Sequence, residues 1–249
     1  MPMAVHAEGQ AAKPCKNAQE LLRLTYPLTH ISSKIATGEA ITIVAIGSSS
    51  TAGAGASSAA ASYPNQLADE LQRQFPKSRI TMINRGVNGE EIGDMLKRFD
   101  KDVVANKPDL VLWQFGTNSL IRDSAMDDRG AMVREGLTKI RSLGADTVLV
   151  DPQFAPKVVA KPEAERMVEF MSKTAKAEGV DLFRRFEVMK QWTVGEGGVQ
   201  FSDFVIADGL HMNDWGYACM AKGLGMAITE AAQRQIVSAK VIRPINIAE

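Results

Sequence analysis

The stretch Ile41–Gly55 reads ITIVAIGSSSTAGAG, and it decides the fold of this chain. Its first six residues, Ile41 to Ile46, are mostly β-branched and apolar, which predicts a fully buried strand. The strand stops at Gly47, and three serines follow. In open α/β sheets the carboxyl ends of the strands border the crevice in which ligands bind. The stretch therefore delivers small hydroxyl residues to a binding crevice.

Three interpretations of this Gly/Ser turn compete. A phosphate cradle would use backbone N–H groups at a helix N-terminus. No Gly-Lys-Ser/Thr completes a P-loop, however, and Ser58 stands where a dinucleotide fingerprint starting at Gly53 needs its third glycine. A tight turn would simply need small residues. A nucleophilic serine would need partners elsewhere in the chain.

Strands alternate with helices along the rest of the chain, which predicts a parallel sheet covered by helices on both faces. Further strands are expected at 79–84, 109–115, 146–150 and 180–183, and helices at 17–36 (broken near Pro27), 62–75, 90–106, 125–143, 162–178 and 215–232. We therefore expect an α/β fold, a three-layer α/β/α sandwich with a five-stranded parallel sheet of the flavodoxin-like kind.

Two irregular stretches, 152–161 and 191–207, are expected to rim the crevice, because long loops in compact domains are more often functional than idle. The second contains Trp192, Phe201 and Phe204, which suit a shallow aromatic surface.

The size and charge of the chain narrow its class. Its 249 residues suit a single domain over 17–249, preceded by a flexible N-terminal tail at 1–16. Lys+Arg and Asp+Glu balance at 29 each, so net charge gives no sign of a nucleic-acid partner. No apolar run reaches the roughly eighteen residues that a membrane span needs.

The two cysteines and the N-terminus leave alternatives open. Cys15 and Cys219 match no metal-ligand spacing, so they are either two buried thiols or one long-range disulfide. Val5-His6-Ala7 resembles the small-residue end of a secretory cleavage site, but no basic and long apolar region precedes it. A periplasmic or secreted location stays open if an upstream signal has been removed, and a cytoplasmic one otherwise.

A candidate general base lies near the end of the chain. His211 follows Asp208 by three residues in a glycine-containing loop. This spacing lets the carboxylate accept the Nδ1–H of the imidazole, so that Nε2 can take a proton from a hydroxyl. An isolated Asp-x-x-His pair is more often a solvated loop pair. The other histidines, His6 and His30, lack such a neighbour.

Gly89 and Asn118 suit an oxyanion hole. A glycine lets its backbone N–H approach a substrate oxygen closely, and an asparagine side chain offers a neutral N–H donor. Each alone usually marks a turn or a cap. Together with a serine and an Asp/His pair they complete the set of groups that acyl transfer requires.

Four short motifs, in this order, resemble those of the SGNH (GDSL-like) hydrolase family. The matching residues are Gly47, Ser49, Thr51 and Gly53 for Gly-Asp-Ser-x-Thr-x-Gly, Asn84, Gly86 and Gly89 for Asn-x-Gly-x-x-Gly, Gly116 and Asn118 for Gly-x-Asn, and Asp208 and His211 for Asp-x-x-His. Two positions depart from the family pattern: Ser48 replaces the usual acidic residue, and Ser119 replaces a frequent aspartate.

The resemblance implies an esterase of the acetylesterase type. Ser49 would attack the ester carbonyl, His211 would act as general base and Asp208 would orient it. The backbone N–H groups of Ser49 and Gly89 and the side chain of Asn118 would hold the oxyanion. No metal or cofactor is implied. The substrate would be a small-molecule or glycan ester, for instance an O-acetyl group on a carbohydrate. Two alternatives remain: an O-acyltransferase with the same site, and a catalytically inactive carbohydrate-binding domain.

Overall fold

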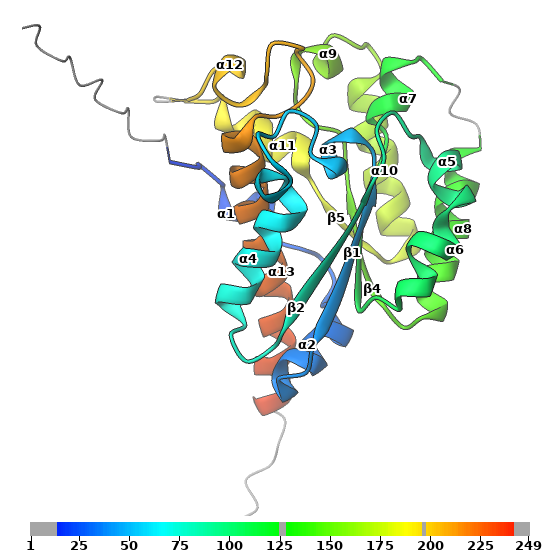
Figure 1. Ribbon diagram of the computed structural model, residues 1–249, viewed down its shortest axis with the longest axis vertical. Coiled ribbons are helices and arrows are strands. Elements are labelled where there is room, and N and C mark those ends of the chain that lie inside the picture. The colour runs from blue at the N-terminus through cyan, green and yellow to red at the C-terminus, as the bar shows by residue number, and fades with distance from the viewer. Residues whose placement is uncertain (1–13, 125–127, 196–197, 242–249) are drawn as a thin grey trace, which may run out of the picture.

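The computed structural model describes residues 14–124, 128–195 and 198–241 (Figure 1). In the described chain, five strands form one sheet in the order β2-β1-β3-β4-β5, and every pairing is parallel. The strands are β1 (Ile41–Gly47), β2 (Ile80–Gly86), β3 (Leu110–Gln114), β4 (Asp146–Val150) and β5 (Asp181–Phe183). The fold predicted from the sequence, a three-layer α/β/α sandwich, is confirmed.

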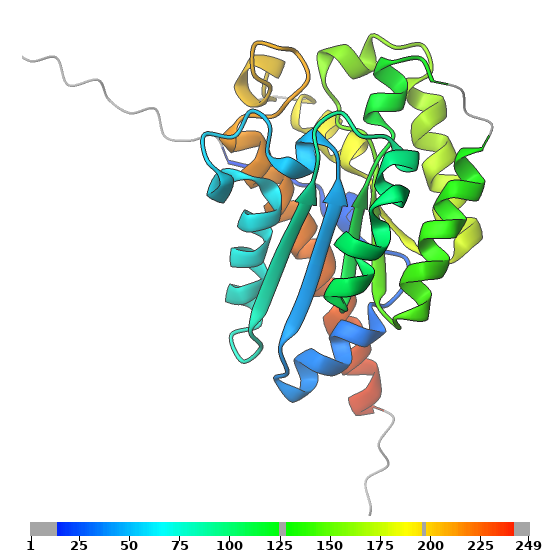
Figure 2. The same cartoon turned by 45° about the vertical axis from the view of Figure 1, so that its right-hand side comes forward.

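Helices cover both faces of this sheet (Figure 2). One face packs against α1 (Gln19–Leu22), α2 (Thr29–Thr37), α4 (Tyr63–Gln74), α11 (Arg185–Trp192), α12 (Phe201–Phe204) and α13 (Asp214–Val241). The other packs against α5 (Ile92–Lys97), α6 (Phe99–Asp102), α7 (Thr117–Ile121), α8 (Arg129–Ser142), α9 (Pro156–Val159) and α10 (Ala164–Glu178). Since side chains of a strand alternate between faces, Ile43 joins the first core and Val44 the second.

The prediction of one continuous helix over 90–106 is wrong. The chain instead forms α5, α6 and a 3-10 turn, Val104–Asn106, with a break at Arg98. The Arg98 guanidinium bonds to the carboxylates of Glu90 and Asp102 and to the backbone oxygen of Arg85. These bonds stabilise the break at Arg98. The sequence pattern did not reveal it, because the apolar side chains recur at helical spacing across the whole segment.

The two stretches expected to be irregular contain helices. The first, 152–161, includes α9, and the second, 191–207, includes α12 and the end of α11. Trp192 and Phe204 are buried and pack edge to face, so they belong to the core and do not form the expected aromatic surface. The last helix extends past Ala232 to Val241.

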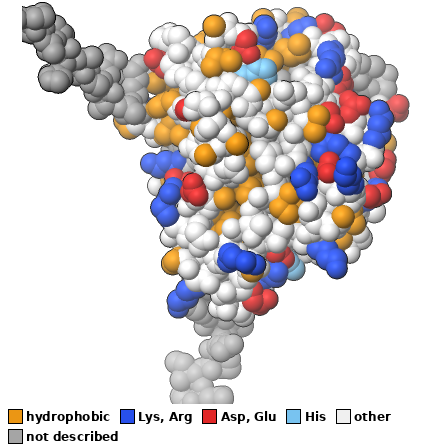
Figure 3. Space-filling model, viewed as in Figure 1, with side chains coloured by type: hydrophobic (Ala, Val, Ile, Leu, Met, Phe, Trp, Pro, Cys, Tyr) orange, Lys and Arg blue, Asp and Glu red, His pale blue; other side chains and the backbone are white. Residues whose placement is uncertain are grey.

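Cys15 and Cys219 form a disulfide, which ties the N-terminal segment to α13. Residues 1–13 of the expected tail lie outside the described residues. Lys/Arg and Asp/Glu side chains are intermixed on the face shown in Figure 3, in keeping with the balanced charge. Within the described ranges, the length and hydropathy of the helices do not suffice for a membrane crossing.

Candidate active site

The carboxyl ends of β1, β2 and β3 bring three turns to one edge of the sheet. Helix α3 (Ser49–Ala52) follows β1, the loop 87–91 follows β2, and α7 follows β3, so that α3 and α7 lie at the same end of the molecule in Figure 1. Parallel strands place their following turns at the ligand-binding crevice. The first three sequence motifs therefore share this crevice.

Ser49, His211 and Asp208 form a chain of hydrogen bonds. Nε2 of His211 lies 2.8 Å from Oγ of Ser49, and Nδ1 lies 2.5 Å from Oδ2 of Asp208. With the proton on Nδ1, the imidazole donates to Asp208 and accepts from the serine hydroxyl. The side chains of His211 and Asp208 are 19% and 35% exposed, so both are partly open to solvent.

The Asp208 carboxylate also holds the loop in shape, because its Oδ1 accepts the backbone N–H groups of Leu210 and His211. Partial burial acts to raise the pKa of Asp208, but the hydrogen bonds from the His211 side chain and from these two N–H groups outweigh it and lower the pKa. The carboxylate is therefore ionised at neutral pH and stabilises a protonated His211.

Close backbone contact fixes the position of the Ser49 turn. A side chain on Gly86 in β2 would collide with the backbone of Thr51 and Ala52, so only glycine lets α3 sit this close to the neighbouring strand. Asn84 reinforces the contact, because its Nδ2 donates to the Thr51 oxygen at 2.8 Å. The Asn84 and Gly86 motif positions are thus structural supports of the serine turn.

The two neighbouring serines point to other partners. Ser48 donates its backbone N–H (2.9 Å) and its hydroxyl (3.1 Å) to Oε1 of Gln114. Ser50 Oγ accepts from Nη1 of Arg185 at 2.9 Å. Of the three adjacent serines, Ser49 is the one whose hydroxyl contacts His211.

Asn118 links the two turns that carry the predicted oxyanion donors. Its Nδ2 donates to the backbone oxygen of Glu90 at 2.8 Å, which ties α7 to the loop containing Gly89. Gly89 has φ +80°, a conformation that side chains disfavour. The amide of Asn118 carries a second N–H, and no described residue accepts it.

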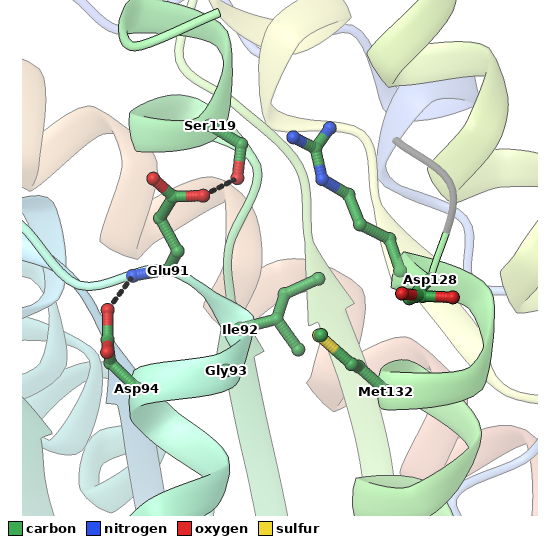
Figure 4. A pocket seen from close by; sticks show the side chains of 8 residues that line it. Glu91, Ile92, Gly93, Asp94, Ser119, Asp128 and Met132 are labelled. Atoms are coloured by element: carbon green, nitrogen blue, oxygen red, sulfur yellow. Dashed lines mark hydrogen bonds between the residues drawn. The ribbon is translucent and has the colours of Figure 1, made fainter. Parts of the chain in front are cut away.

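Ser119, the second departure from the motif, bonds to the Glu91 carboxylate at the end of this loop. Its hydroxyl donates to Oε2 of Glu91 at 2.8 Å, while Oε1 accepts from Arg122 and Ser124. A pocket of about 330 Å³ lies beside this pair, between α5, α7 and α8. Figure 4 shows Glu91 and Ser119 on one side of it and Met132 on the other.

Sequence reasoning missed three buried polar residues around the site: Gln114, Gln153 and Arg185. They belong to no spaced motif. One signal for Gln114 was available, since it is the one polar residue in the apolar strand LVLWQ. For Arg185 and Gln153 the sequence holds no comparable signal. In the described ranges no cluster of three or more His, Cys, Asp or Glu side chains could hold a metal ion.

The fold and the motif residues at the crevice are those expected of the SGNH-like hydrolase family. Residues 14–234 match the model of the non-GDSL lipase-like family, and the chain belongs to that family.

One relative and two solved structures are similar to this chain. The chain is 31% identical over 80 residues to an acetylxylan esterase of Geobacillus stearothermophilus, an alignment covering 31% of this chain and 36% of that protein. A two-domain esterase active on acetylated mannans superposes with TM-score 0.70 at 19% identity, over 85% of this chain and 56% of its own. A catalytic mutant of Axe2, an acetylxylan esterase of G. stearothermophilus, gives TM-score 0.65 at 17% identity, over 77% and 95%.

Proposed function

We propose that this protein is a serine ester hydrolase that removes acetyl groups from a carbohydrate. The observation that carries the proposal is the hydrogen-bonded chain from Ser49 through His211 to Asp208 at the crevice. Two structures of catalytic mutants of Axe2 give further support. One has an aspartate replaced, and the other has a histidine three positions later replaced. Asp208 and His211 have the same spacing.

The reaction runs in two acyl transfers. In the first, His211 takes the Ser49 proton as Oγ attacks the acetyl carbonyl, and the imidazolium then gives this proton to the departing sugar oxygen, which leaves as a hydroxyl. In the second, water gives a proton to His211 as its oxygen attacks the acyl-serine, the imidazolium returns that proton to the departing Oγ of Ser49, and acetic acid leaves and ionises to acetate. Asp208 offsets the positive charge on His211 during both steps.

Negative charge develops on the carbonyl oxygen in each step. The backbone N–H groups of Ser49 and Gly89 and the side chain of Asn118 are the proposed donors to that oxygen. Loss of one such donor typically lowers kcat by about 10²- to 10³-fold.

Acetylated glycans are the proposed substrate class, because the relatives above include esterases named for acetylated xylan and acetylated mannans. A panel of aryl esters from acetyl to twelve-carbon acyl, together with acetylated xylan and mannan oligosaccharides, tests the proposal. We expect the highest kcat/KM on acetyl esters and release of acetate from at least one oligosaccharide. A preference for twelve-carbon esters would contradict it, and acetyl transfer to an added sugar would identify an acyltransferase.

A further inference from the structure

Gln153 is a buried side chain that connects two loops of the site. It follows β4 and is 1% exposed. Its Oε1 accepts the hydroxyl of Thr117 at 2.9 Å, and its Nε2 donates to the backbone oxygen of Leu210 at 3.3 Å. Thr117 precedes Asn118, and Leu210 precedes His211. One amide therefore joins the turn of the oxyanion donor to the loop of the base.

Arg185 contacts the Gln153 amide and is fully buried. Its Nη2 donates to Oε1 of Gln153 at 2.9 Å, and its Nη1 donates to Oγ of Ser50 at 2.9 Å. Its Nε donates to the backbone oxygen of Asp151 at 2.7 Å. Each nitrogen of the guanidinium thus has an acceptor, so the side chain has one fixed orientation.

The contacts of Gln153 and Arg185 reach the neighbours of three site residues in the sequence. Ser50 adjoins Ser49, Thr117 adjoins Asn118, and Leu210 adjoins His211. A buried guanidinium costs desolvation free energy, and ion pairs or polar groups in a core often stabilise a fold no better than apolar residues. Stability alone therefore does not account for this arrangement.

We propose that Gln153 is a positioning residue that sets the His211 loop against the Asn118 turn, with its own orientation fixed by Arg185. The proposal rests on the proposed esterase function. It concerns the geometry of the reaction and not the binding of substrate, because the side chain of Gln153 is buried and its amide bonds only to groups of the protein. Small displacements of reacting groups lower the rate of the chemical step strongly.

The test replaces Gln153 by methionine, which has a similar length and makes none of the three hydrogen bonds. We expect Gln153→Met to lower kcat on an acetyl ester by about tenfold to a hundredfold, with KM changed by less than about threefold. Gln72→Met is the matched control. Gln72 also bonds through both ends of its amide, because its Oε1 accepts the backbone N–H of Ile80 and its Nε2 donates to the Ser78 oxygen, but it lies at the other end of the strands, where β2 begins. This control is expected to lose stability and keep kcat.

Thr117 provides a second pair of variants if Gln153→Met fails to fold. Thr117→Val keeps the volume and removes the hydroxyl, and it should lower kcat several-fold, whereas Thr117→Ser keeps the hydrogen bond and should retain kcat. Equal kcat in the valine and serine variants, or a wild-type kcat in Gln153→Met, would overturn the positioning role. Wild-type turnover in the same assay separates this outcome from failure of the esterase proposal.

Discussion

Nε2 of His211 lies 2.8 Å from Oγ of Ser49, although the two residues are 162 positions apart in the chain. The parallel sheet produces this contact. It places the turn after β1 at the crevice, and the loop before α13 passes over the same edge. Gly55 lets the two segments approach, because a side chain there would collide with the Met212 backbone oxygen and crowd the His211 Cβ.

The rate of ester hydrolysis should depend on a single ionisation at acid pH. His211 must be neutral to accept the serine proton. Asp208 stays ionised there, since hydrogen bonds lower its pKa despite partial burial. A plot of log kcat/KM against pH should therefore rise on the acid side with a slope near one and then level off. A slope near two would show that a second group, such as Asp208, titrates with the histidine.

Asn118→Ala should lower kcat on acetyl esters by about 10²-fold, with a much smaller change in KM, because the oxyanion develops only as the reaction proceeds. The substitution also removes the bond to the Glu90 oxygen. Ser119→Ala serves as the control, since it loses only the support to Glu91. If both variants lose the same fraction of kcat, Asn118 acts through the shape of the loop and not as a donor.

The strand pattern, the layer order and the four motif turns could be predicted from the sequence, because each depends on local signals: apolar runs, breaks and glycines. The break at Arg98 could not, because its cause is a set of contacts with Glu90 and the distant Arg85 oxygen. Gln153 and Arg185 were missed for the same reason. Their hydrogen-bond partners come from loops far apart in the chain, so no sequence motif with a fixed spacing contains them.

The free energy of unfolding should respond to pH through Asp151. This side chain is fully buried, and burial raises its pKa to about 7 against the opposing bond from the Phe186 N–H. The native state then binds more protons than the unfolded state between about pH 4 and about pH 7, so stability falls as pH rises through that window.

Asp151→Asn keeps an acceptor for the Phe186 N–H and cannot ionise. As the pH rises from about 4 to about 8, the wild type should lose up to about 4 kcal/mol of free energy of unfolding that the variant keeps. Urea unfolding of both proteins at about pH 4 and about pH 8 measures this difference. Parallel pH dependences for the two proteins would refute the assignment to Asp151.

Reduction of the Cys15–Cys219 disulfide should destabilise the fold without lowering kcat. The bond closes a loop with a sequence separation of 204 residues, so it restricts the unfolded chain strongly. We expect the free energy of unfolding to fall by about 2–4 kcal/mol in reductant. A Cys15→Ala/Cys219→Ala double variant should be insensitive to reductant. Loss of kcat in the folded, reduced protein would instead connect the disulfide to the site.

The identity of the reacting serine tests the central claim most directly. A fluorophosphonate probe, followed by peptide mass spectrometry, should place the adduct on Ser49, because its hydroxyl contacts His211 while Ser48 and Ser50 contact Gln114 and Arg185. Ser49→Ala should abolish labelling and turnover. Ser48→Ala and Ser50→Ala should keep both at reduced levels, since each loses a supporting bond worth roughly 1 kcal/mol. An adduct on Ser48 or Ser50, or labelling that survives Ser49→Ala, would contradict the proposed site.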